Sequence, residues 1–269
     1  MKKLIVSDMD GTLLNDQQQL SERTREVLRL LTGKGVLFTA ASGRSRRSLK
    51  EHFLDIPFAS ISDNGATIYN DKDELVWYKD IPSGMIRPLW KKVMENAFLH
   101  PVLCGLKNHY VLNSESDEAK DIARYFFNGH VEIINTIEEV FKKDVIVKLS
   151  VHTKTDGSEE KRGFELLKEF GVEFTITLSG GCWIDITHSQ ATKGTAYEEL
   201  CSILRVRPEE TMMFGDYLND LEMLKRCPNS WCMKNGHPDA KIICRHITEY
   251  TNDEDGVARE LAKCFDIEC

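Results

Sequence analysis

The sequence predicts an α/β protein: a Rossmann-like parallel sheet core flanked by helices, with an inserted α+β domain. Short, continuously apolar segments alternate with amphipathic helical segments in residues 1–65, and the same alternation returns after residue 193. Such alternation is typical of parallel strands joined by helical crossovers. The segment between has the alternating polarity of antiparallel strands with one wetter face. We therefore predict a discontinuous core domain, residues 1–82 and 188–269, and an inserted domain, residues 83–187.

The first part of the core contains three predicted strands. Residues 4–6 are continuously apolar, as expected for a strand that is buried on both faces. A helix follows from Ser21, whose hydroxyl is suited to cap it, and ends near Gly33. Residues 36–41 and 58–62 are the next apolar segments, so this part is predicted as strand, helix, strand, helix, strand.

The same patterns predict the elements of the insertion and of the second core part. In the insertion, helices are predicted at residues 117–127 and 159–170, and strands at residues 145–151 and 182–186. In the second core part, helices are predicted at residues 193–204, 218–225 and 253–264, and strands at residues 211–214 and 230–233.

Composition and charge restrict the partners. The chain has 269 residues, of which 41% are apolar and 29% are charged, ordinary values for a soluble globular protein. A formal net charge of −8 argues against nucleic acid and anionic membranes as partners, because both bind basic surfaces. The one basic cluster, residues 44–47, is short, and we interpret it as a solvated helix face. No sequence feature fixes an oligomeric state.

The N-terminal segment and the cysteines indicate the compartment. No apolar run approaches the roughly 20 residues of a membrane span. Asp8 and Asp10 interrupt the first apolar run, so we expect no signal peptide and predict a cytoplasmic protein. The eight cysteines form no C-x-x-C pair, and in a reducing compartment most of them should be thiols that pack as small apolar side chains.

An acidic motif, Asp8-Met9-Asp10-Gly11-Thr12, stands where the first predicted strand ends. The carboxyl ends of parallel strands are where open α/β sheets bind ligands. Residues i and i+2 of an extended chain point the same way, so Asp8 and Asp10 are expected to face one site. Taken alone, the motif is equally well explained as a turn with two exposed acids.

A second acidic cluster favours the functional interpretation. Asp216 and Asp220 follow another apolar segment, residues 211–214. Carboxylates that are brought together repel unless a cation joins them, and Mg²⁺ prefers oxygen ligands. The alternative is the enrichment of acids that is common at helix N-termini.

Two further elements would complete a phosphate site. Ser42 and Gly43 follow the second strand and precede a helix, where a hydroxyl and backbone N–H groups can bind an anion. Lys193 and Gly194 begin a predicted helix. The helix dipole disfavours a cation there, which makes a functional role for Lys193 more plausible than for an ordinary surface lysine.

These motifs together resemble one known family. They are Asp8-Met9-Asp10-Gly11-Thr12-Leu13, Ser42-Gly43-Arg44, Lys193-Gly194, and Gly215-Asp216 with Asn219-Asp220. The set resembles the haloacid dehalogenase (HAD) superfamily, and within it the Cof-type phosphatases, whose large α+β cap domain lies between the second and third core motifs. Asn64-Gly65-Ala66 and residues 252–258 also match that subfamily. One departure is Gly236, where the family usually has alanine after Asn235.

The resemblance implies a role for each motif residue. Asp8 would be the nucleophile and a Mg²⁺ ligand, and Asp10 the general acid/base, with its backbone carbonyl on the metal. Asp216 would be the third metal ligand, supported by Asp220. The residues implied to hold the phosphoryl oxygens are Ser42, Gly43, Lys193, Asn219 and the backbone of Met9.

We therefore predict a Mg²⁺-dependent phosphatase that acts on small phosphate monoesters, such as sugar phosphates or phosphorylated cofactors. The acid at Asp10 disfavours a dehalogenase or an ion-pump-like phosphoenzyme, whose family members lack it. A sugar phosphomutase of the same fold and a non-enzymatic, receiver-like phosphate acceptor remain as alternatives. Candidates on the insertion for contact with substrate, each explained more simply by an ordinary structural role, are Asn108, His109, Tyr110, Lys148, Trp183 and Asp185.

Overall fold

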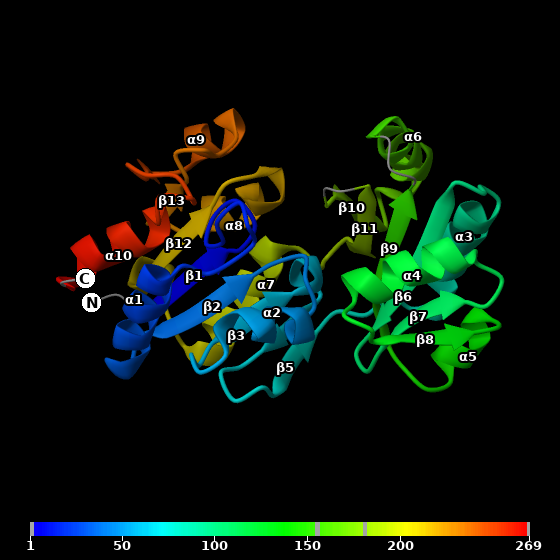
Figure 1. The fold of residues 1–269 in the computed structure, drawn as a ribbon, viewed down its shortest axis with the longest axis horizontal. Helices are drawn as coiled ribbons and strands as arrows, with labels where there is room; N and C mark the ends of the chain where they lie inside the picture. The colour runs from blue at the N-terminus through cyan, green and yellow to red at the C-terminus, as the bar shows by residue number, and fades with distance from the viewer. Residues whose placement is uncertain (1–2, 154–156, 180–181, 268–269) are drawn as a thin grey trace. The chain divides into compact units, whose positions relative to one another are not determined.

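The computed structural model describes residues 3–153, 157–179 and 182–267 (Figure 1). The chain forms two compact units: Met1–Trp77 with Thr192–Cys269, called here the core unit, and Tyr78–Ala191, called the inserted unit. Among the described residues, none of the helices combines the length and apolar character that a bilayer crossing requires.

The core unit is built on an eight-stranded sheet in the order β14-β13-β12-β1-β2-β3-β4-β5. The strands are β1 (Leu4–Asp8), β2 (Leu37–Ala41), β3 (Ala59–Ser62), β4 (Thr67–Tyr69), β5 (Leu75–Tyr78), β12 (Thr211–Gly215), β13 (Ser230–Cys232) and β14 (His246–Ile247). From β14 to β3 all neighbours are parallel, which confirms the predicted fold class. The sheet is not wholly parallel, however, because β4 turns back antiparallel to β3.

Helices cover both faces of this sheet, and the alternation of side chains along β1 shows how. Ile5 belongs to the apolar cluster that includes Leu28 of α1 and Leu261 of α10. Leu4 and Val6 point to the opposite face, into the cluster formed with α7, α8 and α9. The helices are α1 (Glu22–Gly33), α2 (Arg46–Phe53), α7 (Lys193–Leu204), α8 (Leu221–Arg226), α9 (Pro238–Ile243) and α10 (Gly256–Phe265). Burial on both faces explains why the strands read as continuously apolar segments.

The inserted unit is an α+β sandwich around a six-stranded sheet in the order β10-β11-β9-β6-β7-β8. Its strands are β6 (Leu99–Gly105), β7 (His109–Leu112), β8 (Val131–Ile134), β9 (Ile146–Thr153), β10 (Phe174–Leu178) and β11 (Trp183–His188). Its helices are α3 (Ser83–Met94), α4 (Asp117–Phe126), α5 (Ile137–Phe141) and α6 (Gly157–Leu167). The expectation of an antiparallel sheet was wrong for β7 and β8, which pair in parallel because α4 carries the chain back between them.

Buried polar side chains occupy one face of the inserted sheet. Leu149 and Val151 of β9 join the apolar cluster under α3, whereas Lys148 and Ser150 point to the other face. There Lys148 Nζ lies 3.5 Å from a carboxylate oxygen of Asp185, and Ser150 Oγ donates to Asp185 at 2.6 Å. Two of the candidate substrate contacts therefore pair with each other, and their contact with substrate stays a prediction.

The basic cluster at residues 44–47 is not simply a solvated helix face. Arg46 begins α2 and is only 8% exposed, with its guanidinium 3.9 Å from the centre of the Phe58 ring. It donates to the Phe58 carbonyl and to Asp73. The sequence interpretation was wrong here because these partners come from distant positions that no local pattern indicates.

Gly65 packs directly against the beginning of α7. Its φ is +98°, and a Cβ at this position would lie 2.2 Å from the carbonyl carbon of Thr192 and 2.7 Å from the backbone nitrogen of Lys193. The neighbours are backbone atoms, so they cannot move aside as a flexible side chain could. Gly65 therefore fixes the place where Lys193 enters its helix.

We expect Gly65→Ala to lower the free energy of unfolding by about 3 kcal/mol, because it adds a steric clash to the cost of a left-handed alanine. Gly35→Ala is the matched control: Gly35 also has a positive φ, +79°, but no atom within 4 Å of the added Cβ. It should lose only about 1–2 kcal/mol. Urea denaturation of both variants measures the difference, and equal losses would contradict the proposed packing.

Candidate active site

The carboxyl ends of three neighbouring strands carry the predicted site residues. β12, β1 and β2 are adjacent and parallel, with Ser7 opposite Phe214 and Asp8 opposite Ala41. Asp8 is the last residue of β1, Asp216 follows β12, and Ser42 follows β2. Segments that are about 200 positions apart in sequence therefore meet at the edge of the sheet where α/β proteins bind ligands.

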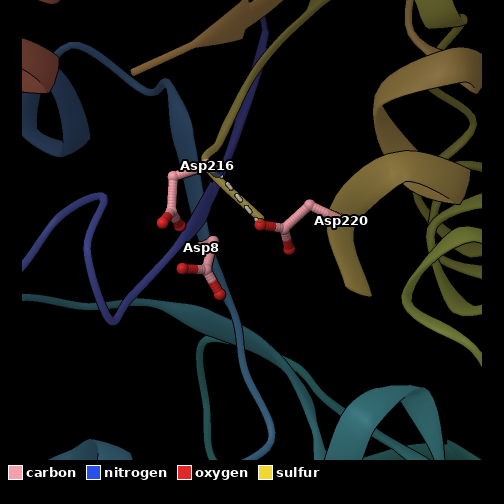
Figure 2. Close-up of side chains that lie close together, drawn as sticks. All are labelled: Asp8, Asp216 and Asp220. Atoms are coloured by element: carbon pink, nitrogen blue, oxygen red, sulfur yellow. Dashed lines mark hydrogen bonds between the residues drawn. The ribbon is translucent and has the colours of Figure 1, made fainter. Parts of the chain in front are cut away.

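Three carboxylates meet at this edge. Asp8, Asp216 and Asp220 each offer an oxygen, and these oxygens lie within 4.8 Å of one another (Figure 2). Asp8 is 6% exposed and Asp220 is fully buried. Like charges this close in a poorly hydrated site are unfavourable unless a cation compensates them.

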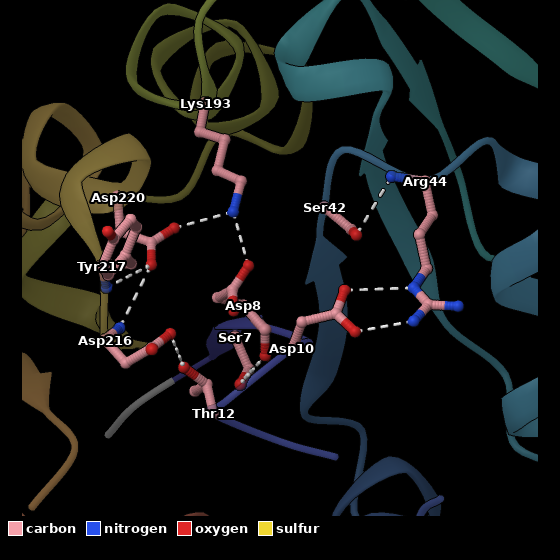
Figure 3. A network of polar contacts seen from close by, with 10 residues as sticks. All are labelled: Ser7, Asp8, Asp10, Thr12, Ser42, Arg44, Lys193, Asp216, Tyr217 and Asp220. Atoms are coloured by element: carbon pink, nitrogen blue, oxygen red, sulfur yellow. Dashed lines mark hydrogen bonds and ion pairs between the residues drawn. The ribbon is translucent and has the colours of Figure 1, made fainter. Parts of the chain in front are cut away.

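Lys193 supplies part of that compensation. As the first residue of α7, it places its buried ammonium between two acids: Nζ donates to Asp8 Oδ1 at 2.5 Å and to Asp220 Oδ1 at 2.7 Å (Figure 3). Burial alone would lower the pKa of Lys193, but attraction to Asp220 and Asp8 outweighs it and raises that pKa. The side chain is therefore an ammonium ion at neutral pH.

One ammonium does not neutralise three carboxylates, and the pKa values of two of these acids are raised. Burial, followed by repulsion from Asp220, raises the pKa of Asp8 well above its ordinary value, although Lys193 opposes the change. Burial and repulsion from Asp220 also raise the pKa of Asp216, to about 6. The excess negative charge makes this position favourable for a divalent cation.

The donor set fits a hard cation. Asp216 rests against the backbone of Gly11, where a Cβ would lie 2.6 Å from Asp216 Oδ2, and Thr12 Oγ1 donates to Asp216 Oδ1 at 2.8 Å. Asp220 is engaged otherwise: its Oδ2 accepts from the backbone N–H groups of Asp216 and Tyr217, and its Oδ1 accepts from Lys193. Asp8 and Asp216 are thus the side chains that could hold a divalent cation, whereas Asp220 hydrogen-bonds to the loop that carries Asp216.

Asp10 does not face this cluster, contrary to the expectation for residues i and i+2. Its carboxylate binds Arg44 in a bidentate manner, with Nε donating to Oδ2 at 3.0 Å and Nη2 to Oδ1 at 2.6 Å (Figure 3). The extended strand ends at Asp8, so the alternation rule no longer applies two residues later. The partly exposed guanidinium then decides the direction of the side chain.

The remaining predicted residues surround the same strand ends. Ser42 is buried, and its Oγ accepts from the backbone N–H of Arg44 at 3.1 Å. Gly43 lies next to Asn64, whose Oδ1 would be 3.0 Å from an added Cβ. Met9 is buried, and its carbonyl accepts from the N–H groups of the turn that follows. Asn219 is half-buried in the 3₁₀ turn Leu218–Asp220, beside Asp220.

Three residues that support these loops have no functional role predicted from the sequence. They are Arg44, which holds Asp10; Thr12, which donates to Asp216; and Asn235, whose Nδ2 donates to the Gly11 carbonyl at 2.8 Å. Arg44 and Thr12 belong to the motifs identified from the sequence, and this was the one indication that they contribute to the site. Their partners could not be read from the motifs, because each contact joins separate segments of the chain.

Comparison with known proteins agrees with this arrangement. The chain belongs to the haloacid dehalogenase-like hydrolase family, whose sequence profile matches residues 5–261. A relative from Haemophilus influenzae is 31% identical over 273 residues, covering 98% of this chain and 99% of the relative. A 5-amino-6-(5-phospho-D-ribitylamino)uracil phosphatase of Bacillus subtilis is 27% identical over 263 residues, covering 96% and 94%.

A solved structure matches the complete architecture. The crystal structure of SMU.1108c from Streptococcus mutans superimposes with a TM-score of 0.85 at 26% identity, covering 99% of this chain and 100% of that one. Together, the family and its phosphatase relatives make this protein a phosphoric monoester hydrolase.

The raised pKa of Asp216 predicts how cation binding depends on pH. The folded pKa, about 6, exceeds the ordinary value of 3.8, so the folded, cation-free protein holds a proton that the unfolded chain releases. The stability of that form therefore falls as pH rises from about 4 to about 6. A cation must displace the same proton, so at pH 5 its affinity should be about tenfold lower than above pH 7.

We expect Mg²⁺ to raise the melting temperature more at pH 7.5 than at pH 5, as measured by thermal unfolding at matched ionic strength. Asp216→Asn is the control, because it removes a charged ligand and the titrating group together. It should abolish most of the Mg²⁺-dependent increase at both pH values. An equal or larger increase at pH 5 in the unaltered protein would contradict the assignment.

Proposed function

We propose that the protein is a Mg²⁺-dependent phosphatase that hydrolyses small phosphate monoesters through an aspartyl-phosphate on Asp8. One observation carries the proposal: Asp8 ends β1 with its carboxylate on Lys193, and an oxygen of Asp216 is close enough to share one cation with it. A sugar phosphate or a phosphorylated cofactor is the expected substrate class. The phosphorylated ribityl compound named for the B. subtilis relative falls within it.

The charges of the site suit attack on a phosphate dianion. A carboxylate and a dianion repel each other, and Mg²⁺ would supply the positive charge that lowers this repulsion. Lys193 contributes a second positive charge and fixes the Asp8 carboxylate at the strand end. Asp8 attacks phosphorus, the bond from phosphorus to the ester oxygen breaks, and the phosphoryl group is transferred to the carboxylate.

Asp10 would move the protons of both steps. It first donates a proton to the departing alkoxide and then accepts one from the water that attacks the aspartyl-phosphate. In the structure both oxygens of Asp10 accept N–H groups of Arg44. Donation requires a proton on one of these oxygens, and that O–H must point toward the departing alkoxide instead of toward Arg44. We infer that the bound dianion draws Arg44 toward itself and releases Asp10.

The roles of the remaining residues follow from their places. Ser42, Gly43 and Asn219, with the backbone of Met9, surround the strand ends where the phosphoryl oxygens would lie. Asp220 would act through its neighbours, because it holds Lys193 and the backbone of the loop that presents Asp216. We propose it as a positioning residue rather than as a metal ligand.

The experiment that tests the function directly is a phosphate-release screen over phosphorylated metabolites, with and without EDTA. We expect Mg²⁺-dependent release from several small monoesters and none after complete removal of divalent cations. Activity that persists after metal removal would contradict the proposed compensation of negative charge by Mg²⁺. Product analysis with glucose 1-phosphate separates hydrolysis, which yields inorganic phosphate, from transfer to a second position on the sugar.

Asp8→Asn should reduce phosphate release by at least about 10⁴-fold, because the amide is a poor nucleophile. It should not destabilise the fold, since it removes one of the mutually repelling charges whose cost raises the pKa of Asp8. Steady-state release from p-nitrophenyl phosphate, together with thermal unfolding, checks both statements. A variant that is folded and retains more than a few per cent of activity would exclude Asp8 as the nucleophile.

Asp10→Asn should lower kcat by about 10²–10⁴-fold, because it removes the proton transfers of both steps but leaves the nucleophile in place. The exposed Asp71 in the same unit provides a matched control, and Asp71→Asn should leave kcat unchanged. Pre-steady-state quench experiments should also find phosphorylated protein in Asp10→Asn, because hydrolysis of the aspartyl-phosphate lacks its base. Unchanged kcat in Asp10→Asn would contradict the assigned role.

A further inference from the structure

Two thiols lie together near β13, the strand next to β12, with Cys232 opposite Gly215. Cys232 ends β13 and is fully buried, and Cys244 follows α9 and is half-buried. Both side chains belong to one apolar cluster, and the backbone N–H of Arg245, next to Cys244, donates to Ser230 Oγ in the same strand as Cys232. Hydrogen bonding between the two thiols lowers the pKa of Cys232 and raises that of Cys244. Both residues are thiols in the structure. The mechanism proposed above uses neither of them.

The chain makes room for the Cys232 thiol. A Cβ on residue 236 would lie 2.5 Å from Cys232 Sγ and 2.9 Å from the Met233 carbonyl oxygen, so alanine fits there only if both atoms move. Gly236 is also the position at which the sequence departs from the alanine that is usual in the family. The departure from alanine therefore has a physical reason: the thiol of Cys232 occupies space that the methyl group of an alanine at position 236 would need.

The segment between the two cysteines supports both acidic loops. The backbone N–H of Met233 donates to the Gly215 carbonyl at 3.1 Å, and the N–H of His237 donates to the Asp216 carbonyl at 2.7 Å. Asn235 Nδ2 donates to the Gly11 carbonyl at 2.8 Å. A covalent link between residues 232 and 244 would close a ring that contains all three supports.

We propose that Cys232 and Cys244 form a reversible disulfide on exposure to a low-molecular-weight disulfide, and that this modification weakens cation binding at the Asp8–Asp216 site. The second part rests on the proposed function, whereas the first part stands on the thiol pair alone. An S–S bond requires a sulfur separation of about 2.05 Å. The bond therefore changes the position of Cys232 Sγ beside Gly236 and constrains the segment whose His237 N–H holds the Asp216 carbonyl.

The chemistry is an exchange of two thiols for one disulfide. The sulfur of Cys244, which solvent can reach, loses its proton and attacks one sulfur of the small disulfide; that S–S bond breaks and the first small thiol leaves. The sulfur of Cys232 then attacks the sulfur of Cys244, forming the intramolecular bond and releasing the second small thiol. Each released thiolate takes up one of the two protons. The protein is oxidised by two electrons, and the small disulfide is reduced by two.

Exposure sets this order, although the hydrogen bond with Cys232 and burial raise the pKa of the Cys244 thiol and so slow the first step. The hydrogen bond from Cys244, and to a smaller extent the charge of Lys241, lowers the pKa of the Cys232 thiol, although burial opposes them. A thiolate is therefore more accessible at Cys232, the sulfur that must complete the second step. Cys244 is the thiol that is exposed enough to make the first contact.

Peptide mapping after incubation with oxidised glutathione tests the modification. Trypsin cleaves after Lys234 and Lys241, so residues 227–234 and 242–245 separate unless a disulfide joins them. We expect the joined pair in the unaltered protein, and a glutathione adduct on Cys244 without cross-linking in Cys232→Ala. Cys264, which is exposed, shows in every sample that the oxidant was active. An adduct that persists on Cys244 of the unaltered protein, or no modification at Cys244, would overturn the proposal.

The Mg²⁺ dependence of phosphate release tests the consequence. After oxidation, the unaltered protein should need about tenfold more Mg²⁺ for half-maximal activity, the size of effect expected when groups that orient metal ligands are disturbed. Dithiothreitol should reverse the change, and Cys244→Ser should show none. An unchanged Mg²⁺ requirement in fully cross-linked protein would refute the link to the site. Absence of activity in the reduced protein would instead count against the proposed function, since the disulfide is mapped without any assay of activity.

Discussion

The ammonium of Lys193, buried between Asp8 and Asp220, is the interaction on which the rest of the site depends. It joins the end of β1, the start of α7 and the loop after β12, three segments that are far apart in sequence. A lysine at a helix N-terminus is disfavoured by the helix dipole, and its burial carries a further cost. The two carboxylates offset both costs, and in return the lysine lets two acids approach closely at one sheet edge.

The compensation is incomplete, and we attribute the proposed binding of a cation to the negative charge that remains. Three acids and one ammonium leave negative charge in a poorly hydrated place, which a divalent cation can reduce. The geometry around Asp216 maintains the arrangement without adding positive charge: Gly11 provides space for its carboxylate, and Thr12 and the Asp220-bound loop fix its direction. Gly65 likewise fixes the position of Lys193, because only a residue without a side chain can pack so closely against the first turn of α7.

Much of this architecture could be predicted, because it follows from periodicity and from the geometry of parallel strands. The apolar segments of β1 and β12 fixed where Asp8 and Asp216 stand, and parallel pairing brings such strand ends together. Contacts between segments that are distant in sequence could not be predicted. The bidentate pairing of Asp10 with Arg44, the contact of Arg46 with Asp73 and the parallel pairing of β7 with β8 depend on tertiary neighbours that no local pattern indicates. The thiol pair is a further example, since Cys232 and Cys244 belong to no recognisable metal or redox motif.

The most direct measurement is anomalous diffraction from a crystal of the protein soaked in Mn²⁺, a substitute for Mg²⁺ whose position can be identified unambiguously. We expect a single strong peak in the core unit, from a Mn²⁺ ion bound to a carboxylate oxygen of Asp8 and to one of Asp216, with Lys193 still bound to Asp220. Manganese located elsewhere, or bound to only one of the two aspartates with the other turned away, would contradict it.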